Sequence, residues 1–244
     1  MVAAGFGAGF INTLAGSGSL LTLPLLIFLG LPATVANGTN RVAILLQNVV
    51  GVSRFHRRGV LDVRGGLWLA MPAIVGSIVG ARIAVEIDEG VLRTTIGVLM
   101  LVMAVVIVLR PKRWLEGEAD KRQGRPSWLQ IAIFFAVGAY GGFIQAGVGV
   151  FLLAGLVLGA GYDLVRANAV KVFIVLCFTA FALAVFVGHD HVRWDLGLVL
   201  ALGNMSGAWV ATRMAVEKGA GFVRWVLVAV VVASGVALLA GAGR

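Results

Sequence analysis

The segment that decides the fold reads Ala15-Gly-Ser-Gly-Ser-Leu-Leu-Thr-Leu-Pro24, a glycine and serine break inside an otherwise apolar run. A polar and basic segment, Ala36-Asn-Gly-Thr-Asn-Arg41, follows it one apolar span later. Both segments recur in the second half of the chain, as Ala146-Gly-Val-Gly149 and Ala167-Asn-Ala-Val-Lys171. The paired segments predict a chain built from two repeats.

A constant separation of 131 residues (147 − 16, and equally 168 − 37) relates the two copies, because it carries Gly16 onto Gly147 and Asn37 onto Asn168. The same separation relates four further pairs: Gly30 and Gly161, Gly76 and Gly207, Arg82 and Arg213, Arg93 and Arg224. Agreement across separate segments indicates an internal duplication.

The composition predicts an all-α polytopic membrane protein. Hydrophobic residues make up 60% of the 244 positions, charged residues 13%, and the mean hydropathy is +1.00. The apolar runs are continuous and about 20 residues long, the length that a helix needs to cross a hydrocarbon core of about 30 Å. Membrane β-strands would instead alternate in short segments. We expect about eight transmembrane helices in two homologous four-span halves, with glycine-broken first and fifth helices.

The first apolar run, residues 2–31, is too long for one straight span, since it would measure roughly 45 Å as a helix. The break at residues 15–19 divides it, and the run at residues 129–161 is divided in the same way at 146–149. The expected organisation is an N-terminal transmembrane repeat over residues 1–110, a basic linker over 111–126 and a C-terminal repeat over 127–244.

The membrane topology has two alternatives. If each broken run crosses the membrane once, the halves are parallel and both termini lie on the cytoplasmic side, which is the alternative that the sequence slightly favours. If each broken run folds back as a hairpin, the halves are inverted. The net charge of +9 collects in short loops beside apolar spans, which is typical of cytoplasmic loops of a cell-membrane protein rather than of nucleic-acid binding. The oligomeric state stays open.

Glycine-rich breaks at membrane depth expose backbone groups, which are tolerated where they face protein or a water-filled cavity. Free N–H groups at half-helix starts, together with amides and cations one span later, favour a small anion as substrate. The predicted substrate-binding residues are Gly16, Ser17, Gly18, Ser19, Asn37, Asn40, Arg41, Gly147, Gly149, Asn168 and Lys171, with Arg82 and Arg213 as possible additions. The alternatives are close helix packing for the glycines and snorkelling to the interface for the cations.

The residues missing from the apolar runs exclude other chemistry. No Asp or Glu lies well inside a run, the three histidines lie in loops, and Cys177 is a lone cysteine. A metal or cation carrier would need such ligands, and an enzyme would need a nucleophile with a base and an orienting group. We therefore expect no metal, no cofactor and no catalytic activity.

At these motifs the chain resembles the sulfite exporter TauE/SafE family of membrane permeases. Residues 9–19, Pro24 and residues 36–41 look like the family's N-terminal signature, and residues 146–149 with 167–171 look like its second copy. Serines at 17 and 19, and Val150, stand where many members carry glycine. The resemblance implies roughly eight spans and transport, often export, of sulfite, sulfonates or related anions. The alternatives are a transporter of another small solute and a membrane scaffold without transport activity.

Overall fold

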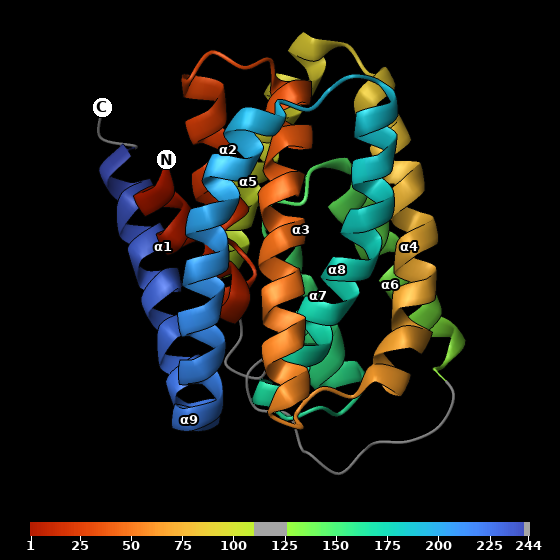
Figure 1. Cartoon of the computed structure of the whole chain (residues 1–244), viewed down its shortest axis with the longest axis vertical. Coiled ribbons are helices and arrows are strands. Elements are labelled where there is room, and N and C mark those ends of the chain that lie inside the picture. Colours follow the sequence, from red (N-terminus) through yellow and green to blue (C-terminus); the bar gives the residue numbers. More distant parts are fainter. Residues whose placement is uncertain (110–125, 242–244) are drawn as a thin grey trace.

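The computed structural model describes residues 1–109 and 126–241, and these residues are all-helical (Figure 1). The expected linker at 111–126 lies outside the described residues except for its last position. The elements are α1 (Val2–Ala15), α2 (Ser19–Phe28), α3 (Ala33–Arg57), α4 (Val63–Glu86), α5 (Glu89–Leu109), α6 (Trp128–Phe143), α7 (Val148–Ala154), the π-helical turn η2 (Gly155–Gly159), α8 (Leu164–Gly188) and α9 (Trp194–Gly241).

Both predicted helix breaks are confirmed. Gly16 ends α1 with φ 75°, and Gly147 precedes α7 with φ 71°. Both values lie in the left-handed region, which glycine adopts without the steric cost that a Cβ atom imposes. Glycine at these two positions therefore lets the chain leave one half-helix and enter the next.

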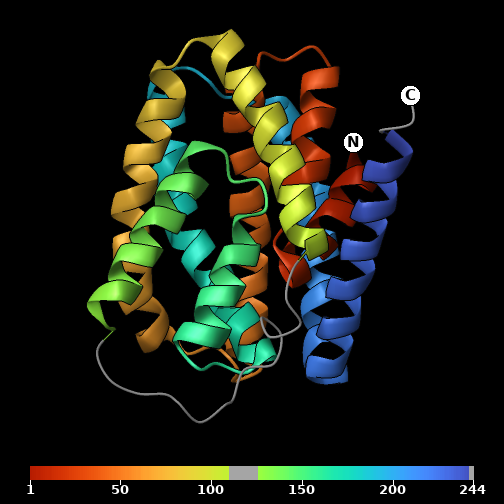
Figure 2. The same ribbon diagram turned by 180° about the vertical axis from the view of Figure 1, so that it is seen from behind.

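Each broken run folds back on itself. In Figures 1 and 2, α1 runs down from the N-terminus and α2 returns upward, whereas α6 runs up and α7 returns downward. With 14 and 10 residues, α1 and α2 are each shorter than the roughly 20 residues of a full span. The ribbon thus follows the inverted arrangement, the second of the two alternatives that the sequence leaves open.

The remaining helices follow the same inversion. The pair α3 and α4 runs down and then up, and α8 with the first part of α9 runs up and then down (Figure 1). Gly219, with φ 70°, kinks α9 into two segments. Among the described helices, α4 and α8 are long and apolar enough to cross a membrane, with mean hydropathies of 1.7 and 2.6.

Each half of the chain packs its first hairpin helix against the other half. Helix α1 of the first half packs against α9 of the second, and α6 of the second half packs against α4 of the first. Glycines make both crossings close: a Cβ atom on Gly9 would overlap the backbone of Asn204, and one on Gly142 would overlap the backbone of Ser77. Small residues of this kind let membrane helices approach backbone to backbone. Between the two crossings, α3 and α8 lie side by side at the centre.

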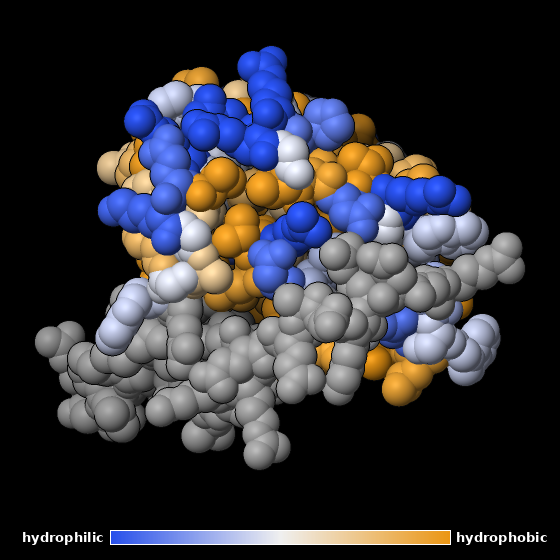
Figure 3. Space-filling view, turned by 90° about the horizontal axis from the view of Figure 1, so that it is seen from below, coloured by the Kyte–Doolittle hydropathy of each residue, from blue (hydrophilic) through white to orange (hydrophobic). Residues whose placement is uncertain are grey.

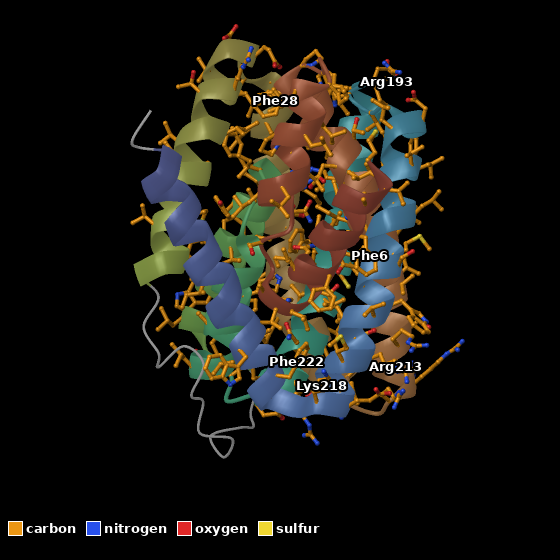
Figure 4. All side chains as sticks on the ribbon, turned by 90° about the vertical axis from the view of Figure 1, so that its left-hand side faces the viewer. Phe6, Phe28, Arg193, Arg213, Lys218 and Phe222 are labelled. Atoms are coloured by element: carbon orange, nitrogen blue, oxygen red, sulfur yellow. The ribbon has the colours of Figure 1, made fainter. Side chains whose placement is uncertain are left out.

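Charged side chains divide unequally between the two ends of the bundle. Figure 3 shows hydrophilic side chains on the lower end, and Figure 4 labels Arg213 and Lys218 there, with Arg193 at the upper end. The turn from α3 to α4, the start of α8 and the kink of α9 lie at the lower end (Figure 1). In and beside these segments, the residues whose side chains the structure describes include seven cations and three acids: Arg54, Arg57, Arg58, Arg64, Arg166, Arg213 and Lys218 against Asp62, Asp163 and Glu217. The turns from α4 to α5 and from α8 to α9 lie at the upper end, and in and beside them are three cations and five acids: Arg82, Arg93 and Arg193 against Glu86, Asp88, Glu89, Asp190 and Asp195.

Candidate functional site

Polar side chains follow one face of each central helix. On α3 they are Asn37, Arg41 and Asn48, and on α8 they are Asn168 and Lys171, all buried. Steps of three, four and seven residues keep side chains on the same face of an α-helix. Because α3 and α8 pack together, their polar faces meet the two glycine breaks between them.

Arg41 binds the end of the broken helix of the other repeat. Its Nη1 donates to the carbonyl oxygen of Gly141 at 3.0 Å and to Oε1 of Gln145 at 3.2 Å. Its Nη2 donates to the carbonyl oxygen of Gly142 at 2.5 Å and to Oδ1 of Asn37 at 3.3 Å. The last carbonyls of a helix have no partner within the helix, and a cation there is favoured by the helix dipole. Arg41 therefore caps α6.

Lys171 makes the reciprocal contact from the second repeat. Its Nζ donates to the carbonyl oxygens of Thr13 at 2.7 Å and Asn12 at 3.2 Å, both in the last turn of α1. It also donates to Oδ1 of Asn168 at 2.7 Å. An ammonium has three protons, so these acceptors match its donors in number. Each cation thus belongs to one half of the chain and caps a hairpin helix of the other half.

The two cations of this region are buried. Arg41 and Lys171 are 0% and 1% exposed, and among the buried polar side chains that the structure describes there is no Asp or Glu. Both cations donate hydrogen bonds to neutral carbonyl and amide oxygens. Burying two cations at membrane depth is costly. An anion bound beside them would reduce that cost.

The two glycine breaks touch at the centre of the molecule. The amide nitrogen of Gly149 lies 3.2 Å from the carbonyl oxygen of Gly16, to which it donates a hydrogen bond. A Cβ atom on either glycine would overlap the Cα atom of the other. The hairpins of the two repeats are therefore in backbone contact where each one turns.

A small cavity with polar and apolar side chains in its lining lies beside this contact. It is lined by Asn12, Gly16, Asn48, Gln145, Val148, Gly149, Lys171 and Val175. Its free space is enough for about one water molecule. An oxyanion is larger than water, so the site is closed in this structure and must widen to admit one.

The structure brings some of the predicted residues to this cavity and places others around it. Gly16, Gly149 and Lys171 line the cavity. Ser17 and Ser19 are buried next to Gly16, and within the described part of the chain neither hydroxyl has a hydrogen-bond partner.

The predicted amides lie in the surrounding hydrogen-bond network. Nδ2 of Asn37 donates to the carbonyl oxygen of Phe143 at 2.7 Å, and Oδ1 of Asn40 accepts from Oγ1 of Thr22 at 2.7 Å. Asn168 binds Lys171, and its Nδ2 has no partner among the described residues. These contacts hold the half-helices against α3 and α8.

Four further predicted residues lie outside the cavity lining. Gly18 precedes α2 and packs against α1, and Gly147 faces the side chain of Met103. Arg82 and Arg213 are exposed toward the ends of the bundle. Nε of Arg213 donates to Oε1 of Glu217 at 3.0 Å, a pair spaced four residues apart on α9.

Three polar lining residues were not among the predicted ones: Asn12, Asn48 and Gln145. Gln145 has a left-handed backbone, with φ 58°, which is uncommon for a residue other than glycine and is found often at functional sites. Its Nε2 donates to Oγ1 of Thr179 at 2.6 Å. The available signal was a polar amide inside an apolar run: Asn12 lies one turn before Gly16, Gln145 directly precedes the second break, and Asn48 lies about two turns beyond Arg41.

Proteins similar to this chain are membrane transporters by name. A probable membrane transporter protein of Sinorhizobium sp, ORF9, is 30% identical over 238 residues, which are 97% of this chain and 90% of the relative. YfcA of Escherichia coli strain K12, also named a probable membrane transporter protein, is 30% identical and covers 91% of this chain and 82% of the relative. No solved structure matches the chain. The fold, the buried polar site and these relatives define a membrane transport protein.

The particular family follows from the full-length match. The profile described as sulfite exporter TauE/SafE matches residues 1–238. The chain belongs to this family, as its glycine and asparagine motifs indicated.

Proposed function

We propose that the protein is a multi-pass carrier of the cell membrane that exports a small sulfur-containing anion, sulfite or an organosulfonate, through the cavity between its two repeats. The observation that carries the proposal is the pair of buried cations, Arg41 and Lys171, with no buried carboxylate among the described residues. An oxyanion bound beside two buried cations would lower the cost of holding them at this depth. The description of the family supports sulfite as substrate and export as direction.

The inverted hairpins support a mechanism of alternating access. In transporters with inverted repeats, the substrate site lies near the midplane between broken helices, and the two repeats rock around it. Here the hairpin α1–α2 enters from one end, α6–α7 enters from the other, and their turns touch at Gly16 and Gly149. Separation of one hairpin from the central helices would open the cavity toward one side of the membrane at a time.

The same geometry gives a proposed topology of six full crossings and two half-membrane hairpins. The crossings are α3, α4, α5, α8 and the two segments of α9. Cytoplasmic loops carry an excess of Lys and Arg, so the lower end is the cytoplasmic one. Within this scheme, residues 1–110 and 127–244 are the two repeats, and 111–126 is the linker between them in the sequence.

Flux through the purified protein in liposomes tests the proposal. Uptake of labelled sulfite and methanesulfonate is measured under an imposed gradient, with choline as a cationic control and empty liposomes as a blank. We expect saturable flux of at least one sulfur oxyanion and none of choline. Transport confined to choline, or no protein-dependent flux of any probe, overturns the anion assignment in favour of another solute or a scaffold role. Assays with gradients of each direction, on protein of known orientation, test export.

A further inference from the structure

The amide of Asn48 is the feature of the cavity that the contacts described above leave unexplained. Asn48 lies on α3, seven residues or about two turns beyond Arg41, and is 1% exposed. Its side chain lines the cavity beside Lys171 and the two glycine breaks. Among the residues that the structure describes, no acceptor lies within hydrogen-bond range of its Nδ2.

The amide nitrogens of the other two lining amides are already engaged. Nδ2 of Asn12 donates to Oε1 of Gln47 at 3.3 Å, and Nε2 of Gln145 donates to Thr179 at 2.6 Å. The ammonium of Lys171 is directed at carbonyl and amide oxygens. Among the side-chain donors of the lining, Nδ2 of Asn48 is therefore the one for which the described residues supply no acceptor.

A buried donor without an acceptor is unfavourable, and such groups in native proteins call for an explanation. A ligand that presents oxygen acceptors would satisfy Nδ2 of Asn48 while its negative charge lies near Lys171. Val148 and Val175 complete the lining with apolar surface. The combination fits a small ligand with a charged oxyanion group and leaves contact surface for a short apolar substituent.

We propose that Asn48 is a substrate-binding residue that donates a hydrogen bond from Nδ2 to an oxygen of the transported oxyanion and makes the site select against ligands without such an acceptor. This assignment rests on the proposed function. The assignment also makes the site differ between the two halves of the chain. The separation of 131 residues carries Asn48 onto Thr179, and the hydroxyl of Thr179 accepts a hydrogen bond from Gln145.

Two substitutions separate a substrate contact from a structural role. Asn48→Leu keeps a similar size and removes the donor, whereas Asn48→Asp keeps the shape and places an acceptor with negative charge where the oxyanion would bind. Asn204→Asp is the matched control, because Asn204 is another buried asparagine that does not line the cavity. Methanesulfonate is the probe, and its binding to purified protein in nanodiscs is measured beside the thermal unfolding midpoint.

We expect Asn48→Leu to weaken methanesulfonate binding at least about tenfold and Asn48→Asp to weaken it further, with Asn204→Asp within about threefold of the unmodified protein. Rescue points the same way: Asn48→Gln, which retains a donor, binds better than Asn48→Leu. Equal binding by the unmodified protein and both Leu and Asp variants overturns the assignment, and the amide then serves only a water molecule. If the unmodified protein itself binds neither methanesulfonate nor sulfite, the proposed function fails instead.

Discussion

Gly16 and Gly149 meet backbone to backbone at the point where the two hairpins turn, with the amide nitrogen of Gly149 donating to the carbonyl oxygen of Gly16 at 3.2 Å. The two residues come from different repeats and are 133 positions apart (149 − 16). Their contact closes one wall of the polar cavity. Any motion that admits a substrate between the hairpins has to loosen the contact between Gly16 and Gly149.

The first prediction concerns this contact. Gly149→Ala should abolish most transport or prevent stable folding, because the added Cβ atom would overlap the Cα atom of Gly16, which has no side chain to move aside. Gly149 lies within α7, where alanine is a better helix former than glycine, so any loss is steric. Flux in liposomes and the thermal midpoint are the measurements.

Gly7→Ala provides the control for this substitution. Gly7 also lies in a helix, α1, but a Cβ atom there would meet nothing within 4 Å. We expect its transport to be unchanged and its stability equal or slightly higher. If Gly149→Ala transports as well as Gly7→Ala, the hairpins are not in contact during transport.

The second prediction concerns topology. In a Cys177→Ser background, Asp195→Cys should react with a membrane-impermeant maleimide in intact cells, and Lys218→Cys should react only after permeabilisation. The inverted arrangement places Asp195 at the upper, outer end and Lys218 at the lower, cytoplasmic end. A parallel arrangement of eight straight spans predicts the reverse for both. Arg57→Cys is cytoplasmic in either case and controls for membrane integrity.

The third prediction concerns the start of α3. The carboxylate of Glu89, at the start of α5, accepts from the amide nitrogens of Ala33 and Thr34, the latter at 3.2 Å, and from Oγ1 of Thr34 at 2.7 Å. An acid that caps a helix N-terminus contributes about 1–2 kcal/mol. Glu89→Ala should therefore lower the free energy of unfolding by that amount, measured by denaturation in detergent. Glu86→Ala, an exposed acid near the end of α4, should have a negligible effect, and equal effects of the two would contradict the capping role.

Much of the architecture follows from local sequence signals. The over-long apolar runs and the glycines at 16 and 147 predicted the helix breaks because only a residue that tolerates positive φ ends one half-helix and turns into the next at that point. These local signals could not predict whether a broken run crosses the membrane or turns back. It depends on the packing of α1 against α9 and of α6 against α4, which are contacts between distant parts of the chain.

The candidate site likewise contains some residues that the sequence predicted and others that it did not. The constant separation of 131 residues drew attention to Asn168, and Lys171 lies within one residue of that separation from Arg41 (171 − 41 = 130). Duplicated polar residues in apolar runs are a signal that one sequence can carry. The same separation carries Asn48 onto Thr179 and Gln145 onto Leu14, and neither of these is an amide. The duplication therefore did not reveal Asn48 and Gln145. The partners of the cations were also hidden, since the carbonyls of α1 and α6 become acceptors only where a helix ends.

The last prediction assigns different roles to the two buried cations, anion binding to Lys171 and stability to Arg41. Lys171 lines the cavity, whereas Arg41 caps α6 outside the lining. We expect Lys171→Ala to weaken methanesulfonate binding at least about tenfold, equivalent to roughly 1.4 kcal/mol. We expect Arg41→Ala mainly to destabilise the protein, because it removes the donor from two buried backbone carbonyls, each costing about 1–3 kcal/mol when left unpaired.

Binding constants and unfolding midpoints, measured on the same preparations, distinguish these roles. Arg41→Lys retains the charge but loses the planar fork that reaches Gly141 and Gly142 together, so it should recover only part of the lost stability. Arg58→Ala is the control: its guanidinium lies in an exposed pair with Glu217 at 3.4 Å, and such pairs contribute about 0–1 kcal/mol. If Lys171→Ala binds the anion with unchanged affinity while Arg41→Ala loses it at full stability, the two assignments are reversed, and the substrate lies against the end of α6 rather than in the cavity beside α1.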